Sequence, residues 1–323
     1  MNRFLITPVR NEALLLERFL EHHAPLFEKI VIADQGSTDG SWEIANAHPQ
    51  VIAIRNHARF YDEHNRRELM LEEVRRREPN AFVMGLDADE FLLADPNKWF
   101  KACSVWALKL TGHHIEFHWN IVYKGLEDWS VTKAAFCSPR LEGNLKETFI
   151  HGTRVPLLDK SHFCDEFPVL HLNLLWPKRQ RMKVCWYAAM EAAHRGRFSL
   201  SPFRLYHMTG NGLYPNKQPI PDKFQKTVRT LVEKISLEDS FETWQREQVL
   251  DFFKSHPAAL RHAAIWGYNW HSVLSALGLP AHPGPSPQAR FASCWVRATH
   301  GIRTTVPIRL ADSILERTLP CLG

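Results

Sequence analysis

The sequence lacks the features that mark membrane-spanning, secreted and zinc-binding proteins. None of its apolar runs approaches the roughly 18 residues that a bilayer-spanning helix needs. Its six cysteines are scattered, with no Cys-x-x-Cys pair, so neither a zinc site nor a disulfide framework is predicted. The first residues resemble a strand and not a secretory signal. Together these absences favour a reduced protein of the cytoplasm.

The chain also has little excess of either charge. It contains 323 residues, of which 40 are Lys or Arg and 35 are Asp or Glu, giving a formal net charge of +5. An excess this small favours anionic ligands without requiring a nucleic acid. Apolar residues make up 45% and charged residues 23%, as in ordinary globular proteins. The length allows one large domain or two moderate ones.

Strand-like runs alternate with helical patterns in the first third of the chain. The predicted strands are Phe4–Thr7, Lys29–Ala33, Val51–Arg55 and Ala81–Leu86. The predicted helices lie between them, at Leu14–His23, from Trp42 onward and at Glu63–Arg77. This alternation predicts an α/β fold with a parallel sheet and helices on both faces.

Three polar loops each follow one of these strands. They are Pro8–Glu12, Asp34–Ser41 and Asp87–Glu90. Ligands bind at the carboxyl ends of the strands in such sheets, and those ends share one edge. We therefore expect the three loops to form one site.

The third loop places Asp87, Asp89 and Glu90 between two apolar runs. An anion that leaves water without a partner costs several kcal/mol, so a positive partner is expected. On an extended backbone Asp87 and Asp89 would point the same way and hold one ion together. Hard oxygen ligands favour Mg²⁺ or Mn²⁺, with substrate phosphates completing the shell. The alternative is a solvated turn, since turns favour Asp.

The three loops resemble, in order and spacing, those of family 2-type glycosyltransferases with the GT-A fold. The segments that carry the resemblance are Val9–Glu12, Asp34–Gly40 and Leu86–Phe91. The sequences Arg-Asn-Glu, His-His and Asp-Ala-Asp-Glu-Phe further resemble a bacterial subgroup. The resemblance is strong over residues 3–100 and loose over 101–195. It departs at Gln35, where the family often has a second acid.

This resemblance implies a GT-A mixed sheet and a metal-dependent enzyme. Such an enzyme moves a sugar from a nucleoside-diphosphate sugar, here expected to be UDP-linked, to a glycan or lipid-linked acceptor in bacterial surface polysaccharide synthesis. Asp34 would accept the N–H of the base. The nucleotide-binding residues implied are Val9, Arg10, Asn11, Glu12, Asp34, Arg66, Asp87, Ala88 and Lys183, and the metal ligands are Asp87, Asp89 and His171. For Arg10 and Arg66 an ordinary surface position is the alternative.

The acceptor side is expected to begin after residue 100. The runs Ser104–Leu110 and His113–Tyr123 predict two strands. The aromatic side chains that could stack on a sugar, or simply pack, are Trp119, Tyr123 and Trp129. An inverting transfer needs a carboxylate base. Asp165 and Glu166, just before the strand-like run Phe167–Leu172, are the predicted base, and the alternatives are Glu127, Asp128 and Glu147.

His171 opens a segment similar to the subgroup's histidine followed by basic residues. The resemblance implies that it is a further metal ligand, with His207 as the alternative. Pro177 predicts the first turn of a helix, whose free N–H groups favour phosphate. The cations that would face the diphosphate from this helix are Arg179, Arg181 and Lys183.

We expect three parts: a transferase domain over 1–200, divided at residue 100 into nucleotide and acceptor halves, a helical extension over 201–280, and a Pro-rich hinge with a basic tail over 281–323. Amphipathic helices are predicted around Phe224–Ile235 and Trp244–Phe253. The tail arginines are Arg290, Arg297, Arg303, Arg309 and Arg317. They predict either a solvated face or peripheral contact with an anionic membrane surface.

Two other function classes stay open. A sugar nucleotidyltransferase usually carries a Gly-rich loop with a Lys after its first strand, and Pro8–Glu12 has neither. A non-catalytic sugar- or nucleotide-binding protein with the same fold would bind nucleotide weakly or not at all.

Overall fold

The structure is a computed structural model of the whole chain. It describes residues 2–57, 62–145, 152–197, 199–200, 204–206, 209, 212–261, 275–278, 287–299, 302 and 305–317. Residue contacts divide the chain into two compact units. The first comprises Met1–Leu175 with Pro215–Ser236, and the second comprises Trp176–Tyr214 with Leu237–Gly323.

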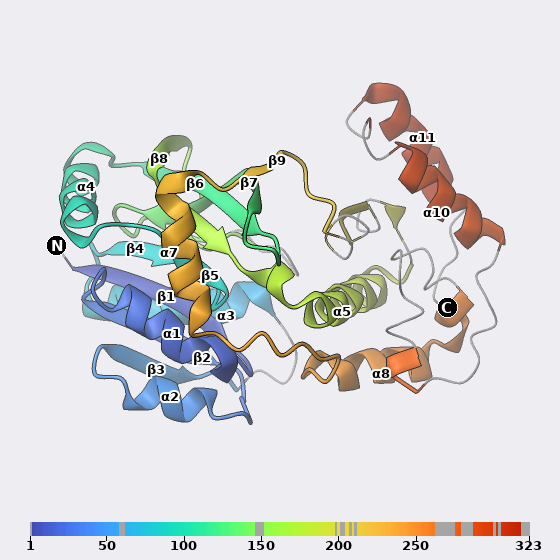
Figure 1. Cartoon of the computed structure of the whole chain (residues 1–323), viewed down its shortest axis with the longest axis horizontal. Helices are drawn as coiled ribbons and strands as arrows, with labels where there is room; N and C mark the ends of the chain where they lie inside the picture. Colours follow the sequence, from blue (N-terminus) through green and yellow to red (C-terminus); the bar gives the residue numbers. More distant parts are fainter. Residues whose placement is uncertain are drawn as a thin grey trace. The chain divides into compact units, whose positions relative to one another are not determined.

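The described part of the first unit is built on a nine-stranded mixed sheet (Figure 1). The strands are β1 (Arg3–Val9), β2 (Lys29–Asp34), β3 (Val51–Arg55), β4 (Phe82–Gly85), β5 (Glu90–Leu92), β6 (His113–Val122), β7 (Asp128–Ser138), β8 (Lys160–His171) and β9 (Lys217–Pro219). Their order is β3-β2-β1-β4-β7-β6-β8-β5, with β9 beside β7. β1 to β4 pair in parallel, whereas β7 is antiparallel to both β4 and β6.

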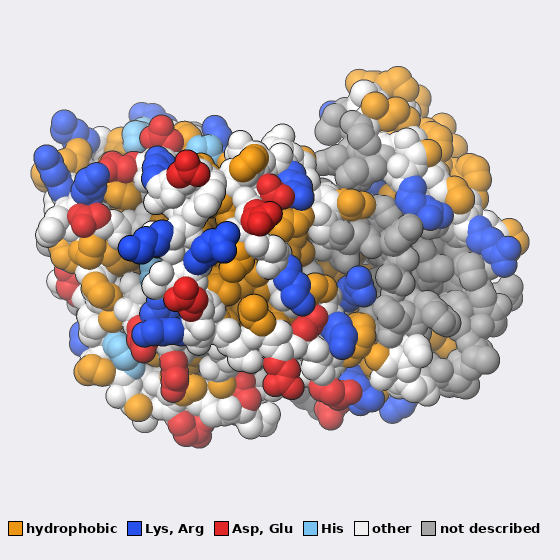
Figure 2. Space-filling view, viewed as in Figure 1, with side chains coloured by type: hydrophobic (Ala, Val, Ile, Leu, Met, Phe, Trp, Pro, Cys, Tyr) orange, Lys and Arg blue, Asp and Glu red, His pale blue; other side chains and the backbone are white. Residues whose placement is uncertain are grey.

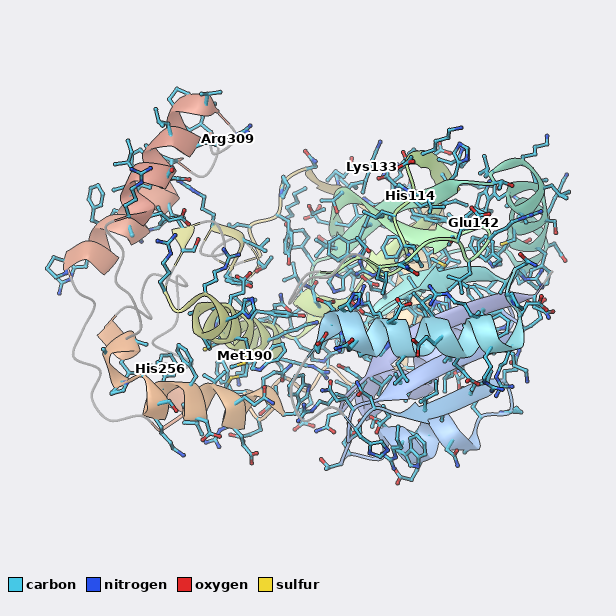
Figure 3. The ribbon with its side chains drawn as sticks, turned by 180° about the vertical axis from the view of Figure 1, so that it is seen from behind. His114, Lys133, Glu142, Met190, His256 and Arg309 are labelled. Atoms are coloured by element: carbon cyan, nitrogen blue, oxygen red, sulfur yellow. The ribbon has the colours of Figure 1, made fainter. Side chains whose placement is uncertain are left out.

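Helices cover both faces of this sheet. They are α1 (Ala13–His23), α2 (Ser41–Ala47), α3 (Glu63–Arg77), α4 (Pro96–Lys109) and α7 (Asp222–Glu233). α1 and α7 lie on the face turned to the viewer in Figure 1, and α3 lies on the opposite face, in front in Figure 3. Met70, Leu71 and Val74 of α3 pack on Ile6 and Val31 of the sheet. The predicted fold class, a mixed α/β sheet covered on both faces, is confirmed.

Most elements of the first third lie where the sequence predicts them. β3 and α3 have the predicted bounds, and α3 begins after Asp62, whose side chain accepts a hydrogen bond from the Asn65 amide. One prediction is wrong: the run Ser104–Leu110 is not a strand, because α4 continues to Lys109 and Leu110 follows as its C-cap. α4 starts at Pro96 and buries Trp99, Cys103 and Trp106 at helical spacing, so the three-to-four residue period decides the structure.

The observed boundaries between the two units follow Leu175, Tyr214 and Ser236, and so differ from the expected boundaries at 200 and 281. β9 pairs with β7, and the Arg18 guanidinium of α1 reaches the Leu231 carbonyl of α7 at 3.4 Å. These contacts attach residues 215–236 to the sheet. The expected hinge, residues 280–287, lies almost wholly outside the described residues.

The second unit contains α5 (Pro177–Arg195), α8 (Gln245–Ser255), α10 (Pro287–Thr299) and α11 (Val306–Glu316). α5 packs on α8, and the Trp186 indole N–H donates to Gln248 at 2.6 Å. Across the described ranges of both units, every helix is too short or too polar to traverse a bilayer.

Candidate active site

The three polar loops meet at one edge of the sheet, as predicted. Val9, the last residue of β1, is opposite Asp34, the last residue of β2. On the other side of β1, the Leu86 amide donates to the Ile6 carbonyl at 3.1 Å, just before the acidic loop begins. Asp34 and Asp87 therefore follow the carboxyl ends of strands on either side of β1.

Short polar side chains join the first two loops. The Asn11 amide donates to the Ser37 hydroxyl at 2.9 Å, and the Asn11 side-chain oxygen accepts from the Thr38 amide at 2.8 Å. The Ala13 amide, at the start of α1, donates to Asp39 at 3.0 Å. Asn11 has φ 54°, a left-handed conformation that Asn tolerates better than most residues. The predicted residues Val9 to Glu12 thus form one rigid wall with residues 34–41.

Asp34 is fully buried at the tip of β2. One of its carboxylate oxygens accepts from Arg55 at 2.7 Å and from the Ser37 amide at 3.2 Å. The other oxygen has no hydrogen-bond partner among the residues that the structure describes. The Arg55 guanidinium lies 3.6 Å over the Trp42 ring. A buried carboxylate with spare acceptor capacity suits a ligand that donates an N–H group.

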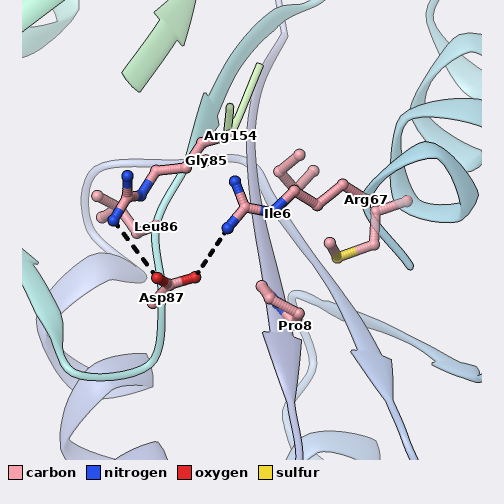
Figure 4. A pocket seen from close by; sticks show the side chains of 8 residues that line it. Ile6, Pro8, Arg67, Gly85, Leu86, Asp87 and Arg154 are labelled. Carbon is pink, nitrogen blue, oxygen red and sulfur yellow. Dashed lines mark hydrogen bonds and ion pairs between the residues drawn. The ribbon is translucent and has the colours of Figure 1, made fainter. Parts of the chain in front are cut away.

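The acidic loop is a tight turn. The Glu90 amide donates to the Asp87 carbonyl at 2.9 Å, so Asp87 and Asp89 do not lie on an extended backbone as expected. Asp87 instead faces a small pocket lined by Ile6, Pro8, Arg67, Met70, Gly85, Leu86 and Arg154 (Figure 4). Arg67 and Arg154 approach its two carboxylate oxygens from opposite sides, at 3.5 and 3.4 Å.

Both arginines are themselves held by buried acids. Arg154 donates through Nε to Glu90 at 2.9 Å and makes a second, shorter bond to the same carboxylate. Arg67 pairs with Glu63 at 2.7 Å, one helical turn earlier on α3. Burial alone would raise the pKa of Asp87, but the charges of Arg154 and Arg67 outweigh it and lower that pKa to about 2. Asp87 is therefore ionised at neutral pH.

The sequence did not single out Arg67 or Arg154. It favoured Arg66, whose guanidinium lies 3.9 Å from Glu63. Arg66 is one residue before Arg67, so its side chain points about 100° away from that of Arg67 around the helix axis. The Glu63–Arg67 spacing of four residues was an available signal for the correct arginine. Arg154 has no such signal, because its partners are more than sixty residues away along the chain.

Asp89 lies beside His171 at the end of β8. Glu90 pairs with His171 across β5 and β8, and Asp89 Oδ2 is 3.3 Å from His171 Nε2. The His171 ring stacks on Trp119 of β6, with ring centroids 4.8 Å apart. The predicted residues Asp89 and His171 are thus brought together, and Trp119 joins them.

Two histidines at the end of α1 hold β5, the strand that directly follows Asp89. His22 Nε2 lies 2.7 Å from the Leu92 carbonyl, and His23 Nε2 accepts from the Leu92 amide at 3.2 Å. His23 Nδ1 is 2.8 Å from the Phe19 carbonyl, so it carries the ring proton. Burial lowers the pKa of both histidines. They are neutral tethers of β5 at neutral pH.

A comparison with protein families supports this geometry. Residues 4–98, which contain the three loops and β1 to β5, match the family model described as Glycosyl transferase family 2. This segment therefore resembles glycosyltransferase family 2, and the rest of the chain lies outside the match. A comparison with curated proteins gave no match.

Solved structures resemble the chain only distantly. They include a putative nucleotide-diphospho-sugar transferase from Desulfovibrio desulfuricans (12% identity, TM-score 0.31, 55% of this chain and 84% of that one). A mannose-1-phosphate geranyltransferase from Thermus thermophilus (12%, 0.28) covers 42% of this chain and 50% of its own. A mannose-6-phosphate isomerase from Helicobacter pylori (10%, 0.27) covers 74% and 91%.

The remaining predicted acceptor residues are less exposed to a ligand. Trp129 is buried and packs against Phe224 of α7, with ring centroids 5.7 Å apart. Tyr123 lies under the Lys217 ammonium, 4.8 Å from its ring centre. Trp119 stacks on His171, the predicted metal ligand. Glu147 and His207 lie outside the described residues.

Asp165 and Glu166, the predicted base, are exposed on a bulge of β8. Cys164 pairs with Phe117 and Val169 with Trp119, so residues 165–168 together face a single residue of β6. That residue is His118. The His118 ring packs against Phe163, two residues before Asp165, with ring centroids 4.8 Å apart. Burial and the charge of Lys133 lower the pKa of His118, and the charge of Asp165 opposes them.

The neighbour His118 shows which face of the sheet Asp165 occupies. β6 pairs regularly with β7 from Glu116 to Val122, so His118 and Trp119 point to opposite faces. Trp119 faces His171, whereas His118 faces Phe163, which is two residues before Asp165 on β8. The structure therefore does not bring Asp165 to the Asp89–His171 group.

Lys183 belongs to α5, in the second unit. α5 does begin at Pro177, as predicted. However, its first free amides, of Lys178 and Arg179, already donate to the Asp239 carboxylate at 2.9 to 3.1 Å. A protein carboxylate thus occupies the place that was expected to attract phosphate.

Proposed function

We propose that the first unit transfers a sugar from a nucleoside-diphosphate sugar, UDP-linked, to a glycan or lipid-linked acceptor of a bacterial surface polysaccharide. The observation that carries the proposal is the meeting of three family-type loops at one sheet edge, with Asp34 and Asp87 on either side of β1. The unpaired oxygen of Asp34 would accept the N–H of the base. The wall formed by residues 9–12 would pack on the nucleoside.

A divalent ion, Mn²⁺ or Mg²⁺, fits beside Asp89 and His171. Adjacent ligands of an octahedral ion with bonds of about 2.1 Å lie about 3 Å apart, and Asp89 Oδ2 and His171 Nε2 are 3.3 Å apart. Among the described side chains no three acids, cysteines or histidines form a metal group, so substrate oxygens would complete the shell. When bound, the ion would stabilise charge on the departing diphosphate.

Asp87 has a different part in this proposal. Because Arg67 and Arg154 already flank its carboxylate, it serves chiefly to fix two guanidinium groups beside the site. Fixed cations near the leaving diphosphate lower the cost of the charge that develops there. Arg10, on the first loop, would add to this field.

The transfer is proposed to invert the anomeric centre, with an acceptor hydroxyl as the nucleophile. The base for that hydroxyl must approach from the face of the sheet that carries Trp119 and His171. Asp165, on the His118 side of β8, does not meet this requirement. Trp119 is placed to stack on a sugar ring next to His171.

A thermal-shift panel tests the proposal. A ligand that binds only the native state raises the melting temperature. We expect UDP-sugars to raise it in the presence of Mn²⁺, and the Mn²⁺-dependent part to disappear in Asp89→Asn. Asp251→Asn, an exposed acid of α8 in the second unit, is the matched control and should respond like the wild type.

Two outcomes would refute the proposal. If no nucleotide or nucleotide sugar shifts the melting temperature, the protein does not bind a donor of this class. If UDP-sugars bind but neither transfer nor slow hydrolysis of the donor occurs in the presence of glycan or lipid-linked acceptors, the non-catalytic alternative is correct. Release of pyrophosphate from UTP and a sugar phosphate would instead identify a nucleotidyltransferase.

A further inference from the structure

α11 turns its acidic side chains inward. The Asp312 carboxylate accepts two hydrogen bonds from Arg204, both at 2.6 Å, and one from the Trp295 indole at 2.7 Å. The Glu316 carboxylate accepts from the Leu200 amide at 2.9 Å, and also from the Ser199 hydroxyl. The inner face of α11 is therefore polar and bonded to the rest of the second unit.

The outer face of the same helix is apolar. Val306, Leu310 and Ile314, spaced four residues apart on one stripe, are 75%, 63% and 57% exposed, and no residue of α11 is buried. Phe291, on the neighbouring helix α10, is 57% exposed. Figure 2 shows these apolar side chains gathered over α10 and α11. A helix at a water-facing surface normally has the opposite orientation, with its apolar stripe inward.

The charges beside this stripe are cationic. The exposed basic residues are Arg290 and Arg297 of α10, Arg309 of α11, and Arg317, which directly follows α11. Figure 2 shows basic groups next to the apolar ones, and Figure 3 labels Arg309 on α11. Both acids of α11, Asp312 and Glu316, are engaged on the inner side. The outer surface thus combines apolar side chains with positive charge.

We propose that the outer face of α11, with Phe291 of α10, binds the surface of an anionic lipid bilayer. A helix with an apolar stripe and flanking arginines lies in the plane of the interface, with the stripe at the acyl boundary and the guanidinium groups among the phosphates. A second copy of the chain would place the same arginines against one another, which like-charge repulsion disfavours. The proposal does not depend on the sugar-transfer activity.

Vesicle co-sedimentation of the full chain tests the proposal. The probes are vesicles of phosphatidylglycerol mixed with phosphatidylcholine, and vesicles of phosphatidylcholine alone. We expect the protein to sediment with the anionic vesicles and to be released by high salt, because salt screens the arginine–phosphate attraction. Neutral vesicles should retain much less protein.

Leu310→Glu tests whether vesicle binding depends on this face or is nonspecific adsorption. Replacing one inserted leucine by an acid is expected to weaken binding by at least tenfold. Leu108→Glu is the matched control, because Leu108 on α4 of the first unit is 77% exposed and far from the stripe in sequence. It should bind like the wild type. Arg309→Gln with Arg317→Gln should weaken binding to anionic vesicles and reduce its dependence on salt.

Three results would overturn the proposal. The first is that the wild-type chain fails to bind anionic vesicles, and the second is that Leu310→Glu and Leu108→Glu bind equally. The third is that the wild type is a dimer in solution which Leu310→Glu dissociates, since the face would then be an interface between two copies. Circular dichroism of each variant checks that it is folded, and Arg309→Gln with Arg317→Gln supplies the test if Leu310→Glu does not fold.

Discussion

Two acidic regions lie at the same sheet edge, and they are stabilised in different ways. Around Asp34, the partners are backbone amides and short polar side chains of two loops, with Arg55 of the neighbouring strand. Around Asp87, the partners are two arginines that lie 20 and 67 residues away in the chain. The first region follows from local sequence and strand pairing, whereas the second depends on the whole fold.

If the Asp87 region depends on distant charges, removing Arg154 should have the largest effect in this molecule. Arg154→Ala leaves Glu90, which is fully buried, without its ion-pair partner. Breaking a buried ion pair on one side costs about 3 to 5 kcal/mol. We expect a loss of that order in the free energy of unfolding, measured by urea denaturation.

Arg76→Ala is the control for Arg154→Ala. Arg76 pairs with Glu73 on the exposed side of α3, with 64% of its side chain accessible. Its removal should leave the urea midpoint almost unchanged, because exposed ion pairs contribute little. Equal losses in the two variants would show that the buried cluster has no special energetic role.

The pH dependence of stability distinguishes the Asp87 region further. Arg154 and Arg67 lower the pKa of Asp87 from 3.8 to about 2. A lowered carboxyl pKa adds stability above its unfolded value, and this stability is lost as pH falls from about 4 to about 2. Asp87→Asn lacks this contribution, so its unfolding free energy should fall by about 2 kcal/mol less than that of the wild type over this interval. Parallel pH profiles in urea titrations would contradict the assignment.

The Asp34 region should respond to smaller, local changes. Asn11→Ala removes the acceptor of the Thr38 amide and places an alanine at φ 54°. We expect a loss of about 2 kcal/mol in the free energy of unfolding. Asn11→Gly removes the same hydrogen bond without the backbone strain. Its free energy of unfolding should therefore fall by only about 1 kcal/mol. If the two variants are equally stable, strain at this position is not significant.

The same contrast explains how far the sequence predicted the structure. β3 and α3 have the predicted bounds because apolar period and capping act within a few residues. The shared edge of the three loops followed from the parallel sheet. The turn at Asp87 was predicted as extended, since the sequence does not reveal that Arg154 and Arg67 supply the positive partners. Ser104–Leu110 resembles a strand as a short apolar run, and only the helix start at Pro96 distinguishes it as the end of α4.

The smallest expected effect concerns Asp165, whose proposed role also depended on long-range placement. Its position before a predicted strand suggested a catalytic base, but a bulge in β8 places it beside His118, on the face opposite Trp119. Asp165→Asn should therefore leave the rate of sugar transfer, or of donor hydrolysis, within about twofold of the wild type. Asp89→Asn, measured alongside, should reduce the same rate by at least a hundredfold if the ion stabilises the leaving diphosphate. A loss of comparable size in Asp165→Asn, with an unchanged KM and melting temperature, would restore Asp165 as the base and would mean that β8 rearranges when the substrate binds.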